Sequence, residues 1–122
     1  MNPRALAARL LPAKRRETPV VSLDEDLPSD YVPALIKVDV NGAEQLAFLG
    51  AQEVLTMHQP HVLFEHGLAA RSYGTKSGEI HELLSNCGLE IFDLLGNGPL
   101  SRDDFSETAQ RRWNFLARAS RG

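Results

Sequence analysis

The stretch that decides the fold is residues 34–44, with the sequence ALIKVDVNGAE. Its first part is apolar and rich in β-branched residues, as in a parallel strand that is covered on both faces. Gly42 then allows a tight turn, and a helix is predicted from about Ala43. This order places Asp39 at the carboxyl end of the strand, where open α/β sheets bind their ligands. We therefore expect Asp39 at the mouth of a site.

Two helical segments are predicted after this turn. The first carries Leu46 and Leu49 on one apolar face, and Gly50 is expected to break it. The second covers residues 51–57, with Val54 and Leu55 pointing inward. A buried strand should follow directly, over residues 61–65.

The C-terminal half predicts one helix and two strands. Ser77 is expected to cap the helix and Gly88 to end it, with an apolar stripe formed by Ile80, Leu83, Leu84 and Cys87. The strands are predicted over residues 89–95 and 113–118, and the polar residues 96–110 are read as a loop between them. Because no helix separates these two strands, we expect them to pair antiparallel.

The order of elements predicts a single α/β domain with right-handed parallel crossovers. We assign residues 19–122 to this domain and residues 1–18 to a basic N-terminal arm. Within the connector that follows the arm, residues 20–23 are a candidate short strand, and Asp24 is a candidate cap for the next turn.

Charge and composition exclude several classes of function. The net charge is −3, but residues 1–16 hold five basic residues and no acidic one. The rest of the chain is strongly acidic, which argues against a nucleic-acid surface. No apolar run is long enough to span a membrane. The single cysteine, Cys87, excludes an internal disulfide and suits a reducing compartment, so a cytoplasmic location is expected.

The motifs around Asp39 resemble a known signature. Residues 35–44, together with Gly50 and Ala51, are similar to the signature of FkbM-type methyltransferases. Three more segments agree with that family in the same order, and they are residues 21–24, 60–65 and 79–92. The resemblance covers roughly residues 19–118 and is carried by the motifs as a group.

The resemblance implies a fold, a reaction and a cofactor. The fold is the Rossmann-like class I methyltransferase sheet, with parallel strands, an antiparallel final strand and helices on the faces. The reaction is O-methylation of a small-molecule or carbohydrate-like hydroxyl acceptor, with S-adenosylmethionine as the methyl donor. The family's glycine-rich turn should precede the signature, but the first glycine here is Gly42. We therefore expect only the C-terminal half of such an enzyme.

The candidate site residues follow from strand ends and from the resemblance. Asp39 and Glu65 end neighbouring parallel strands, so we expect their carboxylates to converge, with His66 beside them as a third catalytic candidate. Asp39 is also the candidate contact to the cofactor. Candidate acceptor contacts are Asn41, which stands where the family usually has Glu, together with Glu44 and Tyr73. No metal site is expected, because the spacing of the histidines does not suit one.

A competing interpretation assigns no catalysis to this chain. Without a preceding partner strand, residues 35–40 would form an exposed sheet edge. The chain would then be a non-catalytic, truncated α/β module. It would associate through this edge with a second copy of itself or with a complementing N-terminal half.

Overall fold

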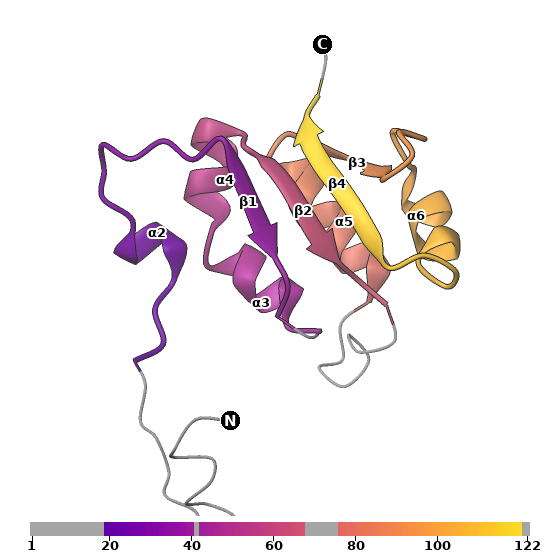
Figure 1. Ribbon diagram of the computed structural model, residues 1–122, viewed down its shortest axis with the longest axis horizontal. Helices are drawn as coiled ribbons and strands as arrows, with labels where there is room; N and C mark the ends of the chain where they lie inside the picture. The colour runs from indigo at the N-terminus through magenta and orange to yellow at the C-terminus, as the bar shows by residue number, and fades with distance from the viewer. Residues whose placement is uncertain (1–18, 41, 68–75, 121–122) are drawn as a thin grey trace, which may run out of the picture.

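The computed structural model describes residues 19–40, 42–67 and 76–120, which form a two-layer α/β structure (Figure 1). The strands are β1 (Leu35–Val38), β2 (His61–Glu65), β3 (Leu89–Asp93) and β4 (Asn114–Ala119). The helices are α2 (Leu23–Asp26), α3 (Glu44–Leu49), α4 (Gln52–His58), α5 (Ser77–Asn86) and α6 (Arg102–Thr108). None of the helices in these ranges is long and apolar enough to cross a membrane. The predicted arm, residues 1–18, lies outside the described residues.

The four strands form one mixed sheet in the order β1-β2-β4-β3. β1 and β2 are parallel, and β4 is antiparallel to both of its neighbours, β2 and β3. The antiparallel pairing of the last two strands is therefore confirmed. The insertion of β4 between β2 and β3 was not predicted, because an antiparallel strand can pair on either side of its predecessor.

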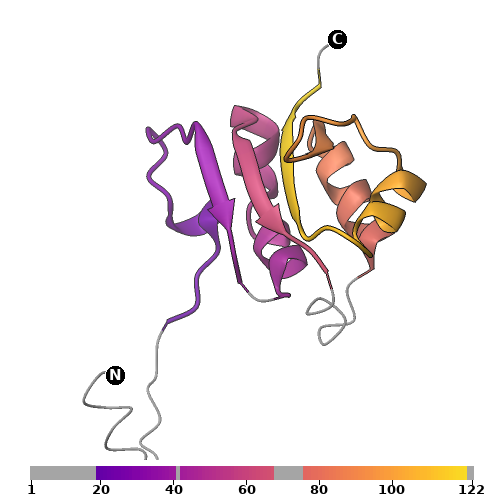
Figure 2. The same ribbon diagram turned by 45° about the vertical axis from the view of Figure 1, so that its right-hand side comes forward.

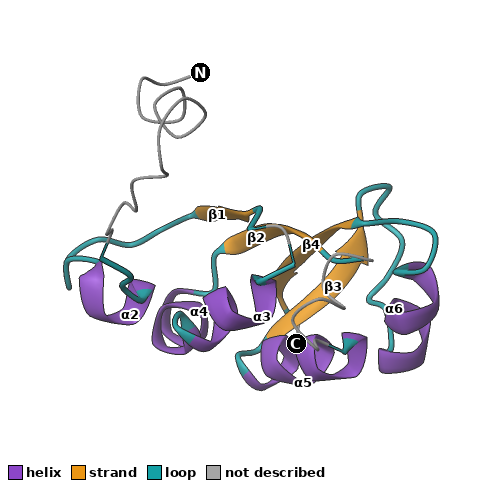
Figure 3. Ribbon diagram, turned by 90° about the horizontal axis from the view of Figure 1, so that it is seen from below, coloured by secondary structure: helices purple, strands orange, loops and turns teal. Residues whose placement is uncertain are grey.

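The helices of the described ranges lie on one face of the sheet (Figure 3). Ile36 and Val38 face the helices, whereas Leu35, which is 58% exposed, and Lys37 belong to the other face. β1 also ends at Val38, two residues earlier than expected. The expectation that this strand is covered on both faces, with helices on both sides of the sheet, is thus wrong for the described residues.

Aromatic contacts between the two layers form the core. Phe64 lies at the centre, 5.4 Å from Phe48, 6.2 Å from Phe105 and 5.7 Å from Phe115 between ring centroids. All four rings are buried, and each comes from a different element. Phe64 meets Phe48 and Phe105 edge-to-face and stacks on Phe115, and both arrangements add to the hydrophobic gain of burial. This cluster fixes α3 and α6 against the sheet.

The apolar face predicted for the first helix is wrong. Leu46 and Leu49 are exposed, and the side chains of α3 that point inward are Glu44 and Phe48. The break at Gly50 and the burial of Val54 and Leu55 in α4 are confirmed.

Helix α6 lies within residues 96–110, for which the sequence predicts a loop, so this prediction is wrong. Ser101 caps this helix, because its Oγ accepts a hydrogen bond from the Asp104 N–H. Phe105, which is fully buried, anchors it to the core. A short polar helix with one buried apolar residue gives little periodicity, so the capping pair Ser101 and Asp104 was the available signal.

The predicted cap of α5 also needs correction. Lys76 is the cap residue, and Ser77 is the first residue of the helix. The end of the helix is as predicted, because Gly88 has a φ of 84°, in the left-handed region.

The segment before β1 contains a short helix in place of the predicted strand. Ser22 caps α2 through a hydrogen bond from the Glu25 N–H. Asp24 reaches a different helix, since its carboxylate accepts hydrogen bonds from the N–H groups of Glu53 and Val54 at 3.1 and 3.0 Å. These groups begin α4, whose own cap position holds Ala51 and offers no side-chain acceptor. Asp24 therefore caps α4 from a distant part of the sequence.

Replacing Asp24 with Ala should destabilise the protein by about 1 kcal/mol, because the start of α4 loses its carboxylate cap. Urea denaturation followed by circular dichroism measures the free energy of unfolding. Asp26→Ala is the matched control, since Asp26 lies in the same helix and is exposed. If Asp24→Ala and Asp26→Ala lower the free energy of unfolding equally, the capping role of Asp24 is contradicted.

Candidate functional site

The carboxyl ends of β1 and β2 lie at the same edge of the sheet (Figure 2). Their last paired residues are Val38 and Phe64, so the next residues along the two strands, Asp39 and Glu65, are neighbours. Asp39 is exposed and Glu65 is half-buried. The structure thus brings together the two carboxylates that the sequence predicted to converge.

A cavity of about 210 Å³ lies at this edge of the sheet. Asp39 and Glu65 line it together with Lys37 on the face that carries no helix. Its lining also includes Asn114, which is paired with Glu65 across β2 and β4, and Leu94 just after β3. Asn114 and Leu94 were not predicted as site residues, because their place depends on the insertion of β4.

Glu44 holds the turn that follows β1. The residue is only 2% exposed, and Oε2 of its carboxylate accepts hydrogen bonds from the N–H groups of Val40 and Gly42 at 3.3 and 3.1 Å. Burial raises the pKa of Glu44, and the nearby charges of Glu65 and Asp39 add to this rise. In this geometry the carboxylate orders the backbone beside Asp39.

His66 lies on the opposite face of the sheet from Glu65. Its ring stacks on Phe105 at 5.4 Å between centroids, and its Nε2 is 2.8 Å from Ser77 Oγ. The His66 backbone N–H donates to the carbonyl oxygen of Trp113. Burial lowers the pKa of His66, which favours the neutral imidazole at physiological pH.

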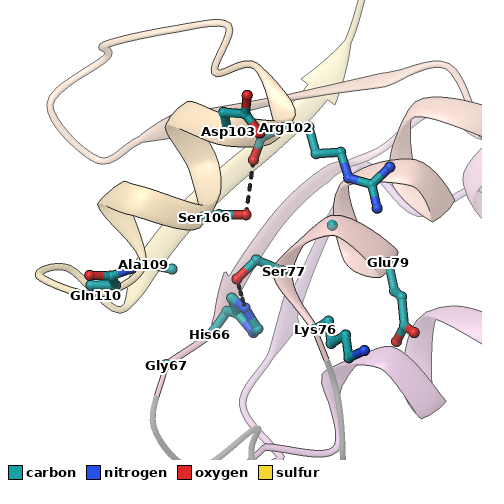
Figure 4. Close-up of a pocket in the computed structure, with 11 residues that line it drawn as sticks. His66, Gly67, Lys76, Ser77, Glu79, Arg102, Asp103, Ser106, Ala109 and Gln110 are labelled. Carbon is teal, nitrogen blue, oxygen red and sulfur yellow. Dashed lines mark hydrogen bonds between the residues drawn. The ribbon is translucent and has the colours of Figure 1, made fainter.

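The predicted site residues that the structure describes do not form one site. Glu44, a predicted acceptor contact, lines neither cavity, because its carboxylate is bonded to backbone N–H groups. Asp39 and Glu65 share the smaller cavity, whereas His66 lines a second cavity of about 860 Å³ between α5 and α6 (Figure 4). Successive residues of a strand point to opposite faces, so Glu65 and His66 cannot both face the smaller cavity. Asn41 and Tyr73, two of the predicted acceptor contacts, lie outside the described residues.

No group of three or more His, Cys, Asp or Glu side chains is arranged to hold a metal ion in the part of the chain that the structure describes. The charges of Asp39 and Glu65 are near enough to raise the pKa of Glu44, but the Glu44 carboxylate is committed to backbone N–H groups. The arrangement at this edge is suited to binding a polar hydroxyl or a cationic group.

Replacing Glu44 with Gln should change how stability depends on pH. The raised pKa means that the folded protein holds this proton more tightly than the unfolded chain does. Wild-type stability relative to Glu44→Gln should therefore fall as the pH rises from about 4 to about 8, because ionised Glu44 becomes a buried charge. Urea denaturation at both pH values measures this, with Glu82→Gln, at an exposed position of α5, as the control. If the difference in unfolding free energy between the wild type and Glu44→Gln does not vary with pH, Glu44 does not have a raised pKa in the folded protein.

Comparison with known proteins adds one finding. The model of the family described as the methyltransferase FkbM domain matches residues 3–91. The match includes β1 and β2, which supply Asp39 and Glu65 to the smaller cavity, whereas Leu94 and Asn114 of its lining lie beyond the matched residues. No curated protein matches the chain, and no solved structure does. Because the match covers well over half of the sequence, the chain belongs to the FkbM methyltransferase domain family.

Proposed function

We propose that this chain forms the acceptor side of an S-adenosylmethionine-dependent methyltransferase that methylates a hydroxyl group of a small or carbohydrate-like molecule. The observation that carries the proposal is the parallel pairing of β1 with β2. Asp39 and Glu65, which both lie in the region that the family model matches, thereby line one cavity. The antiparallel β4 supports a class I methyltransferase sheet, whose final strand has this direction.

The two carboxylates have separate roles in this proposal. Asp39 is the more exposed, so it orients the acceptor hydroxyl and accepts its proton at a carboxylate oxygen. Glu65 is half-buried and accepts a hydrogen bond from a second polar group of the acceptor. The side-chain amide of Asn114 offers both a donor and an acceptor at the same cavity. Glu44 contributes indirectly, because it fixes the turn beside Asp39.

Asp39 and Glu65 suit one part of the implied methyl donor, its positively charged sulfonium. S-adenosylmethionine supplies the methyl group when it is bound, and its sulfonium carries a positive charge. Asp39 and Glu65 give the sheet edge the negative charge that suits this centre. Residues 1–41 contain no glycine, so they include no glycine-rich turn before β1 for close backbone approach. We therefore expect the chain to bind the donor or its product weakly, with a dissociation constant on the order of 1 mM.

Titration of ¹⁵N-labelled protein with S-adenosylhomocysteine, the stable product of the donor, tests this function. Backbone amide resonances of Asp39, Val40 and Glu65 should shift and approach saturation at millimolar concentrations. The product lacks the sulfonium charge but keeps an ammonium group and ribose hydroxyls, which can donate hydrogen bonds to a carboxylate. Asp39→Ala should therefore abolish the shifts, because this acceptor at the sheet edge is lost. Asp30→Ala is the matched control, since Asp30 is exposed and does not line the cavity. Shifts that persist in Asp39→Ala would overturn the role of Asp39.

A second candidate function is a non-catalytic module that associates through β1. Among the described residues, β1 has a neighbouring strand on one side only, and its Leu35 is exposed. An unpaired edge strand is a template for pairing with another chain. This function predicts no shift with S-adenosylhomocysteine and a dimer in analytical ultracentrifugation. A monomer that binds the product would exclude it.

A further inference from the structure

The smaller cavity is polar at one end and apolar at the other. Along the sheet edge, the strand order places four lining residues in succession, and they are Asp39, Glu65, Asn114 and Leu94. The two carboxylates follow β1 and end β2, whereas Leu94 comes directly after β3. Adjacent strands lie about 4.8 Å apart, so two strand spacings put Leu94 about 10 Å from Glu65. A ligand that fills the cavity therefore meets carboxylates at one end and a leucine at the other.

The floor between these two ends is also apolar. Leu63 lines the cavity on the same face of β2 as Glu65, because one strand position separates the two residues. Leu63 is paired with Leu116 across β2 and β4, and both leucines are half-buried. The helices of the described ranges lie on the other face of the sheet, so none of them covers this pair. We call Leu63, Leu94 and Leu116 the leucine strip.

Leu94 lies on an ordered turn. Asp93 is buried, and its carboxylate accepts hydrogen bonds from the N–H groups of Leu95 and Asn97, both at 2.9 Å. The side-chain amide of Asn97 donates to the same carboxylate at 2.7 Å. The backbone on both sides of Leu94 is thus fixed, and yet Leu94 is 59% exposed. An exposed leucine at a cavity gains free energy when an apolar group of a ligand covers it.

Charge is confined to the other end of the cavity. Among the described residues, the three charged side chains of the lining are Lys37, Asp39 and Glu65, which belong to β1 and β2 or directly follow them. The strands β3 and β4 bring Leu94 and the neutral Asn114 to the same cavity. A ligand that is polar over its whole length would therefore leave the leucine strip without an apolar partner.

We propose that the acceptor of the methyl transfer is an amphipathic molecule, whose reacting hydroxyl lies at Asp39 and Glu65 and whose alkyl or other apolar group covers the leucine strip. This inference deepens the proposed function and rests on it, since it names the class of acceptor that the same cavity takes. Leu94 is in this role a specificity-determining residue. A simple sugar fills only the polar end of the cavity, so it binds more weakly than a sugar that carries an apolar group.

Titration of ¹⁵N-labelled protein with hexyl β-D-glucoside, and separately with methyl β-D-glucoside, tests this acceptor class. The two probes have the same hydroxyl groups and differ only in the alkyl chain, and the hexyl compound is kept below its critical micelle concentration. The amide resonances of Glu65, Leu94 and Leu116 should shift and saturate with the hexyl compound. It should bind about tenfold more tightly than the methyl compound, because burial of about two methylene groups contributes this much.

Two variants of Leu94 show whether the leucine strip recognises the alkyl chain. Leu94→Ser should remove the preference for the hexyl compound, whereas Leu94→Met should keep it, because methionine retains a long apolar side chain. Leu46→Ser is the matched control, since Leu46 is 60% exposed but belongs to α3 and does not line the cavity. The proposal is overturned if the wild type binds the two glucosides equally, if neither gives saturating shifts, or if the hexyl preference survives in Leu94→Ser.

The titration with S-adenosylhomocysteine separates a failure of this acceptor class from a failure of the proposed methyl transfer. If S-adenosylhomocysteine shifts Asp39 and Glu65 but the two glucosides bind equally, only the acceptor class is wrong. If none of these ligands shifts the cavity residues, both proposals are wrong. Shifts of Leu94 that follow protein concentration and not glucoside concentration would assign the leucine strip to a contact between copies of the chain, which also contradicts the inference.

Discussion

The alternation of side chains along β2 is the constraint on which the arrangement of the molecule depends. Phe64 points toward the helices and centres the aromatic core, so Glu65 must point to the opposite face and His66 back toward the helices. One strand thereby serves two cavities. The parallel neighbour β1 then determines which carboxylate joins Glu65, because the pairing of Val38 with Phe64 leaves Asp39 beside it.

Burial on one face explains why the other face is available for a ligand. Phe48, Phe105 and Phe115 enclose Phe64 and hold the helices on a single side of the sheet. The smaller cavity opens on the uncovered side, where no helix of the described chain lies. Glu44 connects the two sides, since it is buried at the start of α3 and yet fixes the turn that follows β1. The geometry around Asp39 is therefore coupled to core packing.

Strong local signals explain what the sequence predicted correctly. β2 was predicted with its observed bounds, and the stripe of α5 and the left-handed Gly88 agree with the pattern. The convergence of Asp39 and Glu65 follows from parallel pairing alone.

Other features depend on contacts between distant residues. Asp24 caps α4 from 30 residues away, and β4 enters the sheet between two earlier strands. The sequence alone does, however, argue against placing His66 and Glu65 in one site, because adjacent residues of a strand point to opposite faces of the sheet.

A double-mutant cycle on S-adenosylhomocysteine affinity tests the central claim, which is that Asp39 and Glu65 act on one ligand and His66 does not. The effects of Asp39→Asn and Glu65→Gln on the dissociation constant should deviate from simple multiplication by about threefold or more, since the two groups share a cavity. The effects of Asp39→Asn and His66→Asn on the dissociation constant should simply multiply in the double mutant, as for independent residues. Independence of Asp39 from Glu65, together with coupling of Asp39 to His66, would contradict the account.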